Sequence, residues 1–293
     1  MKKGWIIYNG NLANRPVFTS HVKWFIDTAK EHNILLEAKK NTDILYTLSN
    51  DVTTNSFKEY KPDFVIFFDK DVRLAQSLEN LGVKVFNTSR AIEICDDKTL
   101  MHIVLAKNNI RTPRTILCPK AFRTFTESEL GFLKDVASQL SLPLVIKEAF
   151  GSAGNEVYLI HTKEELIRKT IDLSPSPILF QEYIQESKGK DIRVYIVGGE
   201  FVGAVMRSNT NDWRANAPSG CTMTSYTPSE EEILLAQKAC KAIGLDFAGV
   251  DILFGKDGPI VCEVNSNAHM QRFYEFTGID VVRKIVEYVL LKV

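Results

Sequence analysis

Apolar residues in the first 90 positions follow two periods, one typical of buried strands and one typical of helices. Helices are predicted from Ser20, a favourable N-cap residue, to Asn33, and over residues 72–81, before Gly82. Short apolar runs predict strands at residues 5–8, 44–48, 64–68 and 83–86. Because strands and helices alternate, residues 1–88 are predicted to form a small α/β domain with a parallel sheet.

A second domain is predicted over residues 89–184, with its helices and strands in a different order. One long helix is predicted to begin at Ser89 and to stop before an extended segment at residues 111–118. The elements predicted after it are helices at 127–140 and 164–171 and strands at 144–148, 157–160 and 178–184. Gly151 and Gly154 lie in the loop between the first two of these strands.

The third domain, predicted over residues 185–293, combines two hairpins with two helices. Gly198 and Gly199 join the first hairpin, since they tolerate the positive φ angles of a tight turn. Ser229 and Glu232 have the spacing of a capping box at the start of a helix. The predicted elements are strands at 192–197, 200–206, 247–254 and 260–265 and helices at 229–244 and 280–291, with an aperiodic polar stretch at 208–227.

Composition indicates a globular protein and argues against several classes of partner. Of the 293 residues, 45% are hydrophobic and 25% are charged, and 36 Lys and Arg residues balance 36 Asp and Glu residues. Without an excess of positive charge, nucleic acid is not expected as a partner. No apolar run approaches the ~20 residues that span a bilayer, so we predict a cytoplasmic protein without a membrane partner. The five cysteines are widely spaced and lack a C-x-x-C pair, which favours neither disulfides nor a thiolate zinc site.

The second hairpin of the third domain places two acidic residues and an amide on one face. A three-residue loop in which Gly255 pairs with Pro259 predicts that Asp251 lies directly opposite Glu263. Asn265, two residues further on, shares their face. Carboxylate and amide oxygens are hard ligands that magnesium accepts, so this spacing predicts a Mg-nucleotide site. In the alternative, another register turns Asp251 to solvent and Glu263 lies at a surface edge.

Lys147 ends an apolar run just before the loop that holds Gly151 and Gly154. An ammonium group beside freed backbone N–H groups is suited to binding phosphate, although two-glycine turns are also common without a ligand. The loop matches neither the G-x₄-G-K-[ST] spacing nor a G-x-G-x-x-G sequence, which excludes two well-known nucleotide folds. Lys98, after two aspartates near a helix start, is also explained by surface ion pairs.

Several further side chains support more than one interpretation. Arg193, Arg207 and Arg214 are suited to binding phosphate or carboxylate, but most exposed arginines have no ligand. The run Gln-Glu-Tyr-Ile at 181–184 is also compatible with a plain buried strand. Isolated histidines such as His102 are more often structural than catalytic, so we assign none of them as a base.

These pieces together resemble the ATP-grasp superfamily and, within it, the RimK-like carboxylate–amine ligases, over about residues 87–291. The resemblance is carried by DDK at 96–98, PLVIKEAFGSAGNEV at 143–157, QEYI at 181–184, DIRVYIVGGEFVGAVMR at 191–207, DWRAN at 212–216, GVDILF at 249–254 and CEVNSN at 262–267. The fold that it implies is α/β and α+β, with a small N-terminal α/β pre-ATP-grasp domain followed by a two-lobed ATP-grasp fold. Two segments depart from the usual family pattern, namely FGSAG in the glycine loop and NSNAHMQRF after Glu263 and Val264.

The resemblance also implies a role for each matching residue. Lysines would bind ATP phosphates under a mobile glycine loop, main-chain groups of Glu182 and Ile184 would recognise adenine, and Asp191 would hold the ribose. The implied cofactor-binding residues are Lys98, Lys147, Gly151, Ser152, Gly154, Gln181, Glu182, Tyr183, Ile184, Asp191 and Leu253. The implied metal ligands are Asp251, Glu263 and Asn265, and the implied catalytic residues are Arg207, Arg214 and Asn216.

The implied activity is an ATP-dependent ligation that forms an amide or peptide bond through an acyl phosphate and releases ADP and phosphate. The implied cofactors are ATP and Mg²⁺, with Mn²⁺ as the alternative metal. The implied substrates are a small-molecule or peptide carboxylate and an amino-acid amine, and a homo-oligomer is left open. Two alternatives remain, a ligase of the D-alanine–D-alanine type and a non-catalytic ATP-binding regulatory or scaffold protein.

Overall fold

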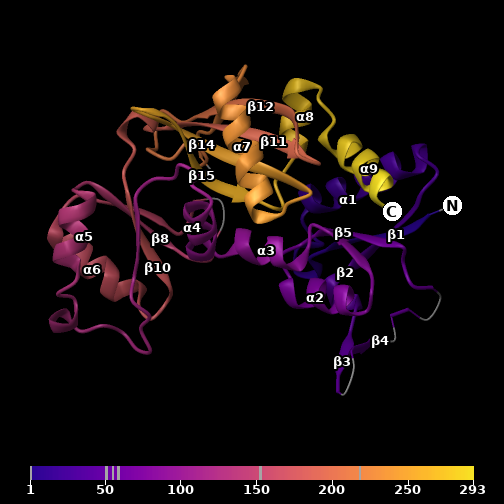
Figure 1. Ribbon diagram of the computed structural model, residues 1–293, viewed down its shortest axis with the longest axis horizontal. Coiled ribbons are helices and arrows are strands. Elements are labelled where there is room, and N and C mark those ends of the chain that lie inside the picture. Colours follow the sequence, from indigo (N-terminus) through magenta and orange to yellow (C-terminus); the bar gives the residue numbers. More distant parts are fainter. Residues whose placement is uncertain (1, 50–51, 55, 58–59, 152–153, 218) are drawn as a thin grey trace.

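The computed structural model of this protein describes residues 2–49, 52–54, 56–57, 60–151, 154–217 and 219–293. It contains both parallel and antiparallel sheets, so the expected mixture of α/β and α+β architecture is confirmed. Figure 1 shows the three larger sheets in three parts of the molecule, with the third sheet above and between the other two. Within the described ranges, no helix has the length and apolar character that crossing a membrane requires.

The first sheet is parallel and has the strand order β2-β1-β5-β6. Its strands are β1 (Lys3–Tyr8), β2 (Leu35–Lys40), β5 (Phe64–Phe68) and β6 (Lys84–Phe86). The helices of this part are α1 (Pro16–Glu31) and α2 (Val72–Asn80), with the short 3₁₀ turns η1 (Gly10–Leu12) and η2 (Asn41–Asp43). Three of the four predicted strands of this part are therefore confirmed.

The predicted strand at 44–48 is wrong as a member of this sheet. The edge position belongs to β2, whose sequence is LLEAKK. Only Leu36 among its side chains is buried, so the strand has no apolar run by which it could be predicted. The segment β3 (Tyr46–Leu48) instead pairs with β4 (Val52–Thr54) in a separate antiparallel hairpin. Helix α1 also begins earlier than Ser20, because Pro16 fits the first turn of a helix, where its missing N–H costs no hydrogen bond.

Two helices, rather than the single long one predicted, lead from the first sheet toward the second. They are α3 (Ser89–Asp96), capped by Thr88, and α4 (Lys98–Lys107). The break falls at Asp97, whose side chain accepts hydrogen bonds from the backbone N–H groups of Thr99 and Leu100 and so caps the second helix. The break places Lys98 at the first position of α4, where its backbone N–H donates to the Ala149 carbonyl.

The second sheet is antiparallel and has the order β7-β10-β8-β9. Its strands are β7 (Thr115–Leu117), β8 (Leu144–Glu148), β9 (Val157–Ile160) and β10 (Ile178–Glu182), and its helices are α5 (Leu133–Leu140) and α6 (Lys163–Leu173). The helix predicted at 127–140 is interrupted, since η3 (Glu127–Glu129) is a separate 3₁₀ turn and Gly131 follows it. Glycine is a poor helix former, which accounts for the later start of α5.

The third sheet is antiparallel and has the order β13-β12-β11-β14-β15. Its strands are β11 (Lys190–Val197), β12 (Glu200–Ser208), β13 (Thr222–Ser225), β14 (Phe247–Gly255) and β15 (Gly258–Asn265). The remaining helices are α7 (Glu230–Ile243), α8 (Gln271–Thr277), α9 (Val281–Lys292) and the 3₁₀ turn η4 (Gln185–Ser187). The predicted capping box at Ser229 and Glu232 is confirmed, whereas β13 and α8 had no periodic pattern to predict them.

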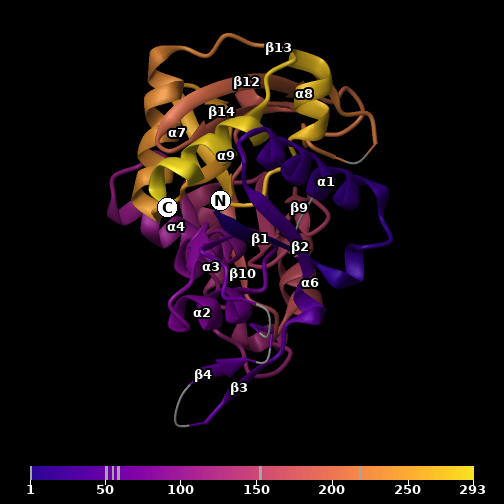
Figure 2. The ribbon, with the colours of Figure 1, turned by 90° about the vertical axis from the view of Figure 1, so that its right-hand side faces the viewer.

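The two ends of the sequence share one hydrophobic core. Phe25 of α1 and Ile66 of β5 are packed in the same buried cluster as Ile285 and Val286 of α9. Figure 2 shows α9 lying beside α1. We propose domains at residues 1–88, 89–184 and 185–293, each of which contains one of the larger sheets. Helix α9, at the end of the third domain, packs against the first domain.

Asn87 connects the first sheet to the third and is fully buried. Its Nδ2 donates to the carbonyls of Phe247 and Ser266 at 2.9 and 3.1 Å. Its Oδ1 accepts from the backbone N–H groups of Asp246 and Phe247 at 2.7 and 3.1 Å. One side chain therefore satisfies four backbone groups where the two sheets meet.

We expect Asn87→Ala to lower the free energy of unfolding by about 3 kcal/mol, because buried backbone groups lose their partners without access to water. Urea unfolding followed by circular dichroism measures this change. Asn108→Ala is the control, since Asn108 is exposed and its side chain, among the described contacts, bonds within its own helix end, and about 0.5 kcal/mol or less is expected there. A loss in Asn87→Ala no larger than in the control would contradict the role of Asn87 as a connector.

Candidate active site

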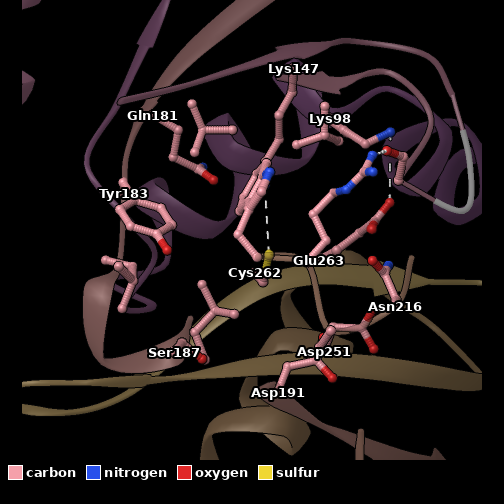
Figure 3. Close-up of a pocket in the computed structure, with 18 of the residues that line it drawn as sticks. Lys98, Lys147, Gln181, Tyr183, Ser187, Asp191, Asn216, Asp251, Cys262 and Glu263 are labelled. Carbon is pink, nitrogen blue, oxygen red and sulfur yellow. Dashed lines mark hydrogen bonds and ion pairs between the residues drawn. The ribbon is translucent and has the colours of Figure 1, made fainter. Parts of the chain in front are cut away.

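A cavity that is partly open to solvent lies between the second and third sheets, and its empty space, open solvent included, is about 860 Å³. Strands β8 and β10 contribute one wall, and β14 and β15 contribute the other (Figure 3). The predicted site residues that line it are Lys98, Lys147, Gly151, Gly154, Gln181, Glu182, Tyr183, Ile184, Asp191, Arg214, Asn216, Asp251, Leu253 and Glu263. Neither Arg207 nor Asn265 is among the described lining residues, and Ser152 lies outside the described residues.

The hairpin formed by β14 and β15 has the predicted pairing of Asp251 with Glu263, but its turn differs from the prediction. Gly255 pairs with Gly258, so the loop has two residues rather than three. A β-bulge at Cys262 compensates for this difference, because one extra residue in β15 restores the register beyond it. The bulge also lets two consecutive side chains, Cys262 and Glu263, line the same cavity, which strict alternation along a strand does not allow.

Two lysines face the acidic hairpin across the cavity. Lys98 Nζ lies 3.7 Å from Glu263 Oε1 and donates to the Gly151 carbonyl at 3.1 Å. Lys147 Nζ lies 3.6 Å from Cys262 Sγ, as the dashed line in Figure 3 shows. Both lysine residues are only 7% exposed, so the alternative of surface ion pairs for Lys98 is wrong. Two buried ammonium groups beside a cavity form a site suited to an anionic ligand.

Three buried charged groups, Asp191, Arg207 and Asp251, form a network with the partly buried Arg193 at the cavity wall. Arg207 binds both carboxylate oxygens of Asp191 at 2.6 and 2.7 Å, and its NH2 group lies 3.0 Å from Asp251 Oδ2. Arg193 binds both oxygens of Asp251 at 2.7 Å. The network explains why Arg207 does not line the cavity, since its guanidinium group is occupied by two aspartates.

The network also sets the ionisation of its two aspartates. Burial alone would raise the pKa of Asp251, but the arginines at 193 and 207 outweigh it and hold that pKa below the usual range. For Asp191 burial dominates and raises the pKa, although Arg207 opposes the shift. Asp251 therefore stays ionised at neutral pH, as a metal ligand must.

The residues present fit a divalent metal held together with a polyphosphate. Asp251 and Glu263 offer hard oxygen donors on the wall opposite the lysines, and magnesium is usually held by one or two carboxylates, with phosphate oxygens completing its shell. Asn265 pairs with Gly249, and its Nδ2 lies 3.4 Å from the Gly249 carbonyl, so its amide nitrogen is turned to the backbone. Across the described ranges, no three His, Cys, Asp or Glu side chains gather into a metal-binding group of their own.

Tyr183, Trp213 and Leu253 contribute apolar surface to the cavity. The ring of Tyr183 meets that of Trp213 edge-on, with 5.8 Å between the ring centroids, and Leu253 lines the same cavity. Glu182 is held by Arg114, whose backbone N–H and Nε donate to its carboxylate at 2.8 and 2.7 Å. Aromatic and aliphatic walls with nearby main-chain polar groups are suited to a flat heterocycle.

Arg214 ties the aperiodic polar stretch to the glycine loop. Its guanidinium group binds the Asp212 carboxylate and donates to the carbonyl of Gly154. The hydrogen bond with Asp212 is the main cause of the raised pKa of Arg214. Gly154 has a φ of +70°, which favours glycine, and a Cβ there would make a tight contact of 3.2 Å with Asn216 Oδ1. The structure thus brings Arg214 and Asn216 to the loop that the sequence predicted as a cover.

Several lining residues were not predicted from the sequence. They are Val145, Glu156, Val157, Ser187, Lys190, Trp213, Ala215 and Cys262. Strand alternation could have indicated Val145, which lies two positions before Lys147 on β8. Cys262 could not be found in this way, because only the bulge turns it into the cavity.

Comparison with known proteins defines the class to which this fold and site belong. A family model of the RimK-like ATP-grasp domain matches residues 95–289. The uncharacterized MG012 homolog of Mycoplasma pneumoniae is 32% identical over 93% of this chain and 94% of its own length. The probable alpha-L-glutamate ligase of Mannheimia succiniciproducens is 29% identical over 92% of this chain and 90% of its own length.

Solved structures agree at the level of the fold. A RimK domain ATP-grasp protein of Sphaerobacter thermophilus has a TM-score of 0.72 at 16% identity, covering 98% of this chain and 99% of its own. The VanG D-Ala:D-Ser ligase of Enterococcus faecalis has a TM-score of 0.76 at 15% identity, covering 100% and 99%. The structure thus has the fold of the ATP-grasp class. Within that class the chain belongs to the RimK-like ATP-grasp family, as the family match over most of its length shows.

Proposed function

We propose that this protein is an ATP- and Mg²⁺-dependent ligase that activates a carboxylate as an acyl phosphate and joins it to an amine. The observation that carries the proposal is the pair Lys98 and Lys147 facing the carboxylates of Asp251 and Glu263 across one cavity. Such a site balances the negative charge of a nucleotide triphosphate with two ammonium groups, while two carboxylates hold its metal.

The chain's own residues supply binding and charge compensation rather than a nucleophile. Lys98 and Lys147 hold the phosphates, and Glu182, Tyr183 and Ile184 line the base end. Bound Mg²⁺ would offset the charge that develops on the transferring phosphoryl group. Arg214 is already at the cavity and becomes available to the transferring oxygens when it releases the Gly154 carbonyl.

Arg207 acts differently from the expectation. Because it is 4% exposed and bound to two aspartates, we propose that it orients Asp251 and Asp191 instead of contacting the γ-phosphate. Asp191 still lines the cavity and remains our proposal for the ribose. Asn265 remains our proposal for a metal ligand. Asn216 remains our proposal for a contact with the acyl-phosphate intermediate.

The amine substrate is proposed to be an amino acid, with glutamate as the first compound to test. The support is the relative described as a probable alpha-L-glutamate ligase, together with the family match. VanG and the D-alanine ligase of Bacillus anthracis superpose on this chain as well as the RimK domain protein does. Their identity is only 15–19%, so the D-alanine–D-alanine alternative is supported by similarity of fold alone. The carboxylate is proposed to be a small molecule or a peptide end.

An intermediate trapped by hydroxylamine tests the proposal. With Mg-ATP and the correct carboxylate but no amine, we expect a hydroxamate to accumulate together with ADP, because hydroxylamine attacks an acyl phosphate. Arg214→Ala should lower hydroxamate formation about 100-fold while changing ADP affinity little, since its charge acts mainly in the transition state. Colorimetric hydroxamate detection and calorimetric ADP titration measure the two effects.

Arg90→Ala is the matched control, because Arg90 is exposed and pairs only with Glu93 in the described contacts. It should leave both quantities unchanged. ADP release without hydroxamate across a panel of amino acids, dicarboxylates and acidic peptides would exclude the ligase reaction and leave an ATPase or a nucleotide-binding scaffold.

A further inference from the structure

Helix α4 contacts strand β15 along one of its sides (Figure 1). Lys98, at the first position of the helix, lies 3.7 Å from the Glu263 carboxylate. Met101, almost one turn later, places its Sδ 3.3 Å from the backbone nitrogen of Val264, the next residue of β15. Residues three apart lie on the same side of a helix, so one face of α4 makes both contacts. The proposed phosphate site accounts for the first contact but not for the second.

Strand β15 is at the edge of the third sheet, so its outward N–H groups need partners from outside the sheet. The N–H of Val264 points away from β14 and donates to the sulfur of Met101. The N–H of Val261 also points outward and donates to the Arg111 carbonyl at 2.9 Å. These two groups are three positions apart instead of two, because the bulge at Cys262 adds a residue between them.

The residue type at position 101 fits this contact. Met101 and Val264 are both 0% exposed, so water cannot satisfy the N–H group. The side chain must also be apolar, because it packs in the same buried cluster as Leu105 and Ala236. Methionine combines a long apolar side chain with an acceptor atom, although its sulfur is a weak acceptor. Leucine would fill a similar volume and would leave the N–H group without a partner.

The contact acts on the backbone between two proposed metal ligands. The N–H of Val264 belongs to the peptide group that follows Glu263, so holding it fixes the peptide plane beside that residue. The bulge comes directly before Glu263, and there the ladder with β14 is disrupted and constrains the backbone less. Asn265 follows Val264 on the other side. Magnesium demands near-ideal octahedral geometry, so its affinity depends on how these two residues are oriented.

We propose that Met101 is a positioning residue for the metal site, whose sulfur holds the Val264 N–H group and so orients Glu263 and Asn265 toward the metal. The inference rests on the proposed Mg-nucleotide function and adds a residue that is not among the described lining residues of the cavity. Because Lys98 lies on the same face, α4 also sets the spacing between a phosphate-binding cation and the metal ligands.

Met101→Leu tests the proposal, because it removes the acceptor and nearly conserves the volume. With saturating ADP, we expect the variant to bind Mn²⁺ about tenfold more weakly than the wild type, the low end of the effect typical of groups that orient metal ligands. Electron paramagnetic resonance of free Mn²⁺ measures this affinity without turnover. The affinity for ADP in EDTA, measured by calorimetry, should stay within about twofold, since the phosphate-binding lysines are unchanged.

Met270→Leu is the matched control. Met270 is 3% exposed, and its sulfur accepts no hydrogen bond among the described contacts. The two variants should unfold at similar urea concentrations, because both exchange one buried apolar side chain for another of similar size. Only Met101→Leu should bind Mn²⁺ more weakly. Equal Mn²⁺ affinity in the two variants would overturn the proposal.

Norleucine keeps the test valid if Met101→Leu does not fold. Replacing the five methionines of the wild-type protein by norleucine exchanges each sulfur for a methylene group. Among the described contacts, the sulfur of Met101 is the one that accepts a hydrogen bond, so the same loss of Mn²⁺ affinity, about tenfold, is expected. Unchanged affinity would overturn the role of Met101 while leaving the metal site intact. If the wild-type protein binds no Mn²⁺ in the presence of ADP, the proposed function fails together with this inference.

Discussion

Asp251→Asn is expected to lower the free energy of unfolding by about 3–5 kcal/mol, the cost typical of breaking a buried ion pair from one side. In the native protein this carboxylate, 2% exposed, receives hydrogen bonds from Arg193 and Arg207. An asparagine would leave the partly buried Arg193 without its carboxylate partner and the buried Arg207 with Asp191 alone. Urea unfolding at pH 7, with an unchanged m-value, measures the loss.

Asp212→Asn is the matched control, because the Asp212 carboxylate pairs with Arg214 at a partly exposed position, where a loss of about 1 kcal/mol or less is expected.

The pH dependence of stability gives a second check. The pKa of Asp251 is lowered from 3.8 in the folded state, so its stabilisation is complete above that value and is lost as the pH falls through the lower one. The difference between the wild type and Asp251→Asn should thus shrink in acid, and a constant difference would contradict the ion-pair explanation.

Glu263→Gln is expected to lower turnover by about 100- to 1,000-fold while leaving the protein folded. The carboxylate is a proposed metal ligand and carries little of the stability, since its ion pair with Lys98 spans 3.7 Å and Lys98 keeps its bond to Gly151. Removing one of two opposed carboxylates should leave the melting temperature unchanged or slightly raised. Steady-state rates over a Mg²⁺ titration, with a thermal scan beside them, measure both.

Glu148→Gln provides the comparison for Glu263→Gln. Glu148 follows Lys147 on β8, but it bonds to the Tyr158 hydroxyl at 3.2 Å and is not among the described lining residues. Turnover in this control should stay within about twofold of the wild type, the range of ordinary surface changes. Equal activity of Glu263→Gln and Glu148→Gln would show that Glu263 holds no metal needed for the reaction.

Local patterns in the sequence were sufficient to predict much of the fold and most of the cavity wall. The capping box at Ser229, the apolar strands around Lys147 and the acidic hairpin each depend on residues close together in the chain, so their spacing determines their geometry. Asp251 and Glu263 do pair as predicted, but for a different reason, because the shorter turn and the bulge at Cys262 cancel.

The failures involve partners that are distant in the chain. Arg207 was assigned to phosphate, yet it is bound to Asp191 and Asp251, which lie 16 and 44 residues away and which no periodic pattern connects to it. His102 is buried, in agreement with its interpretation as structural, but its contact with Gln181 spans 79 positions and no local pattern predicts it. A local pattern predicts the face on which a side chain lies. It does not predict which of several charged groups, distant in the chain, binds that side chain.

The hydrophobic core that α1 shares with α9 has a consequence for how the protein is made. Residues 281–289 complete a core whose other members, such as Ile6 and Phe25, leave the ribosome first. Translation at about 5–20 residues per second separates these two groups by about 10–50 s, during which α1 can pack against the first sheet but the surface that α9 covers stays open. The first sheet and α1 therefore gain their full stability only after residues 281–289 have been made, and until then part of their apolar surface is uncovered.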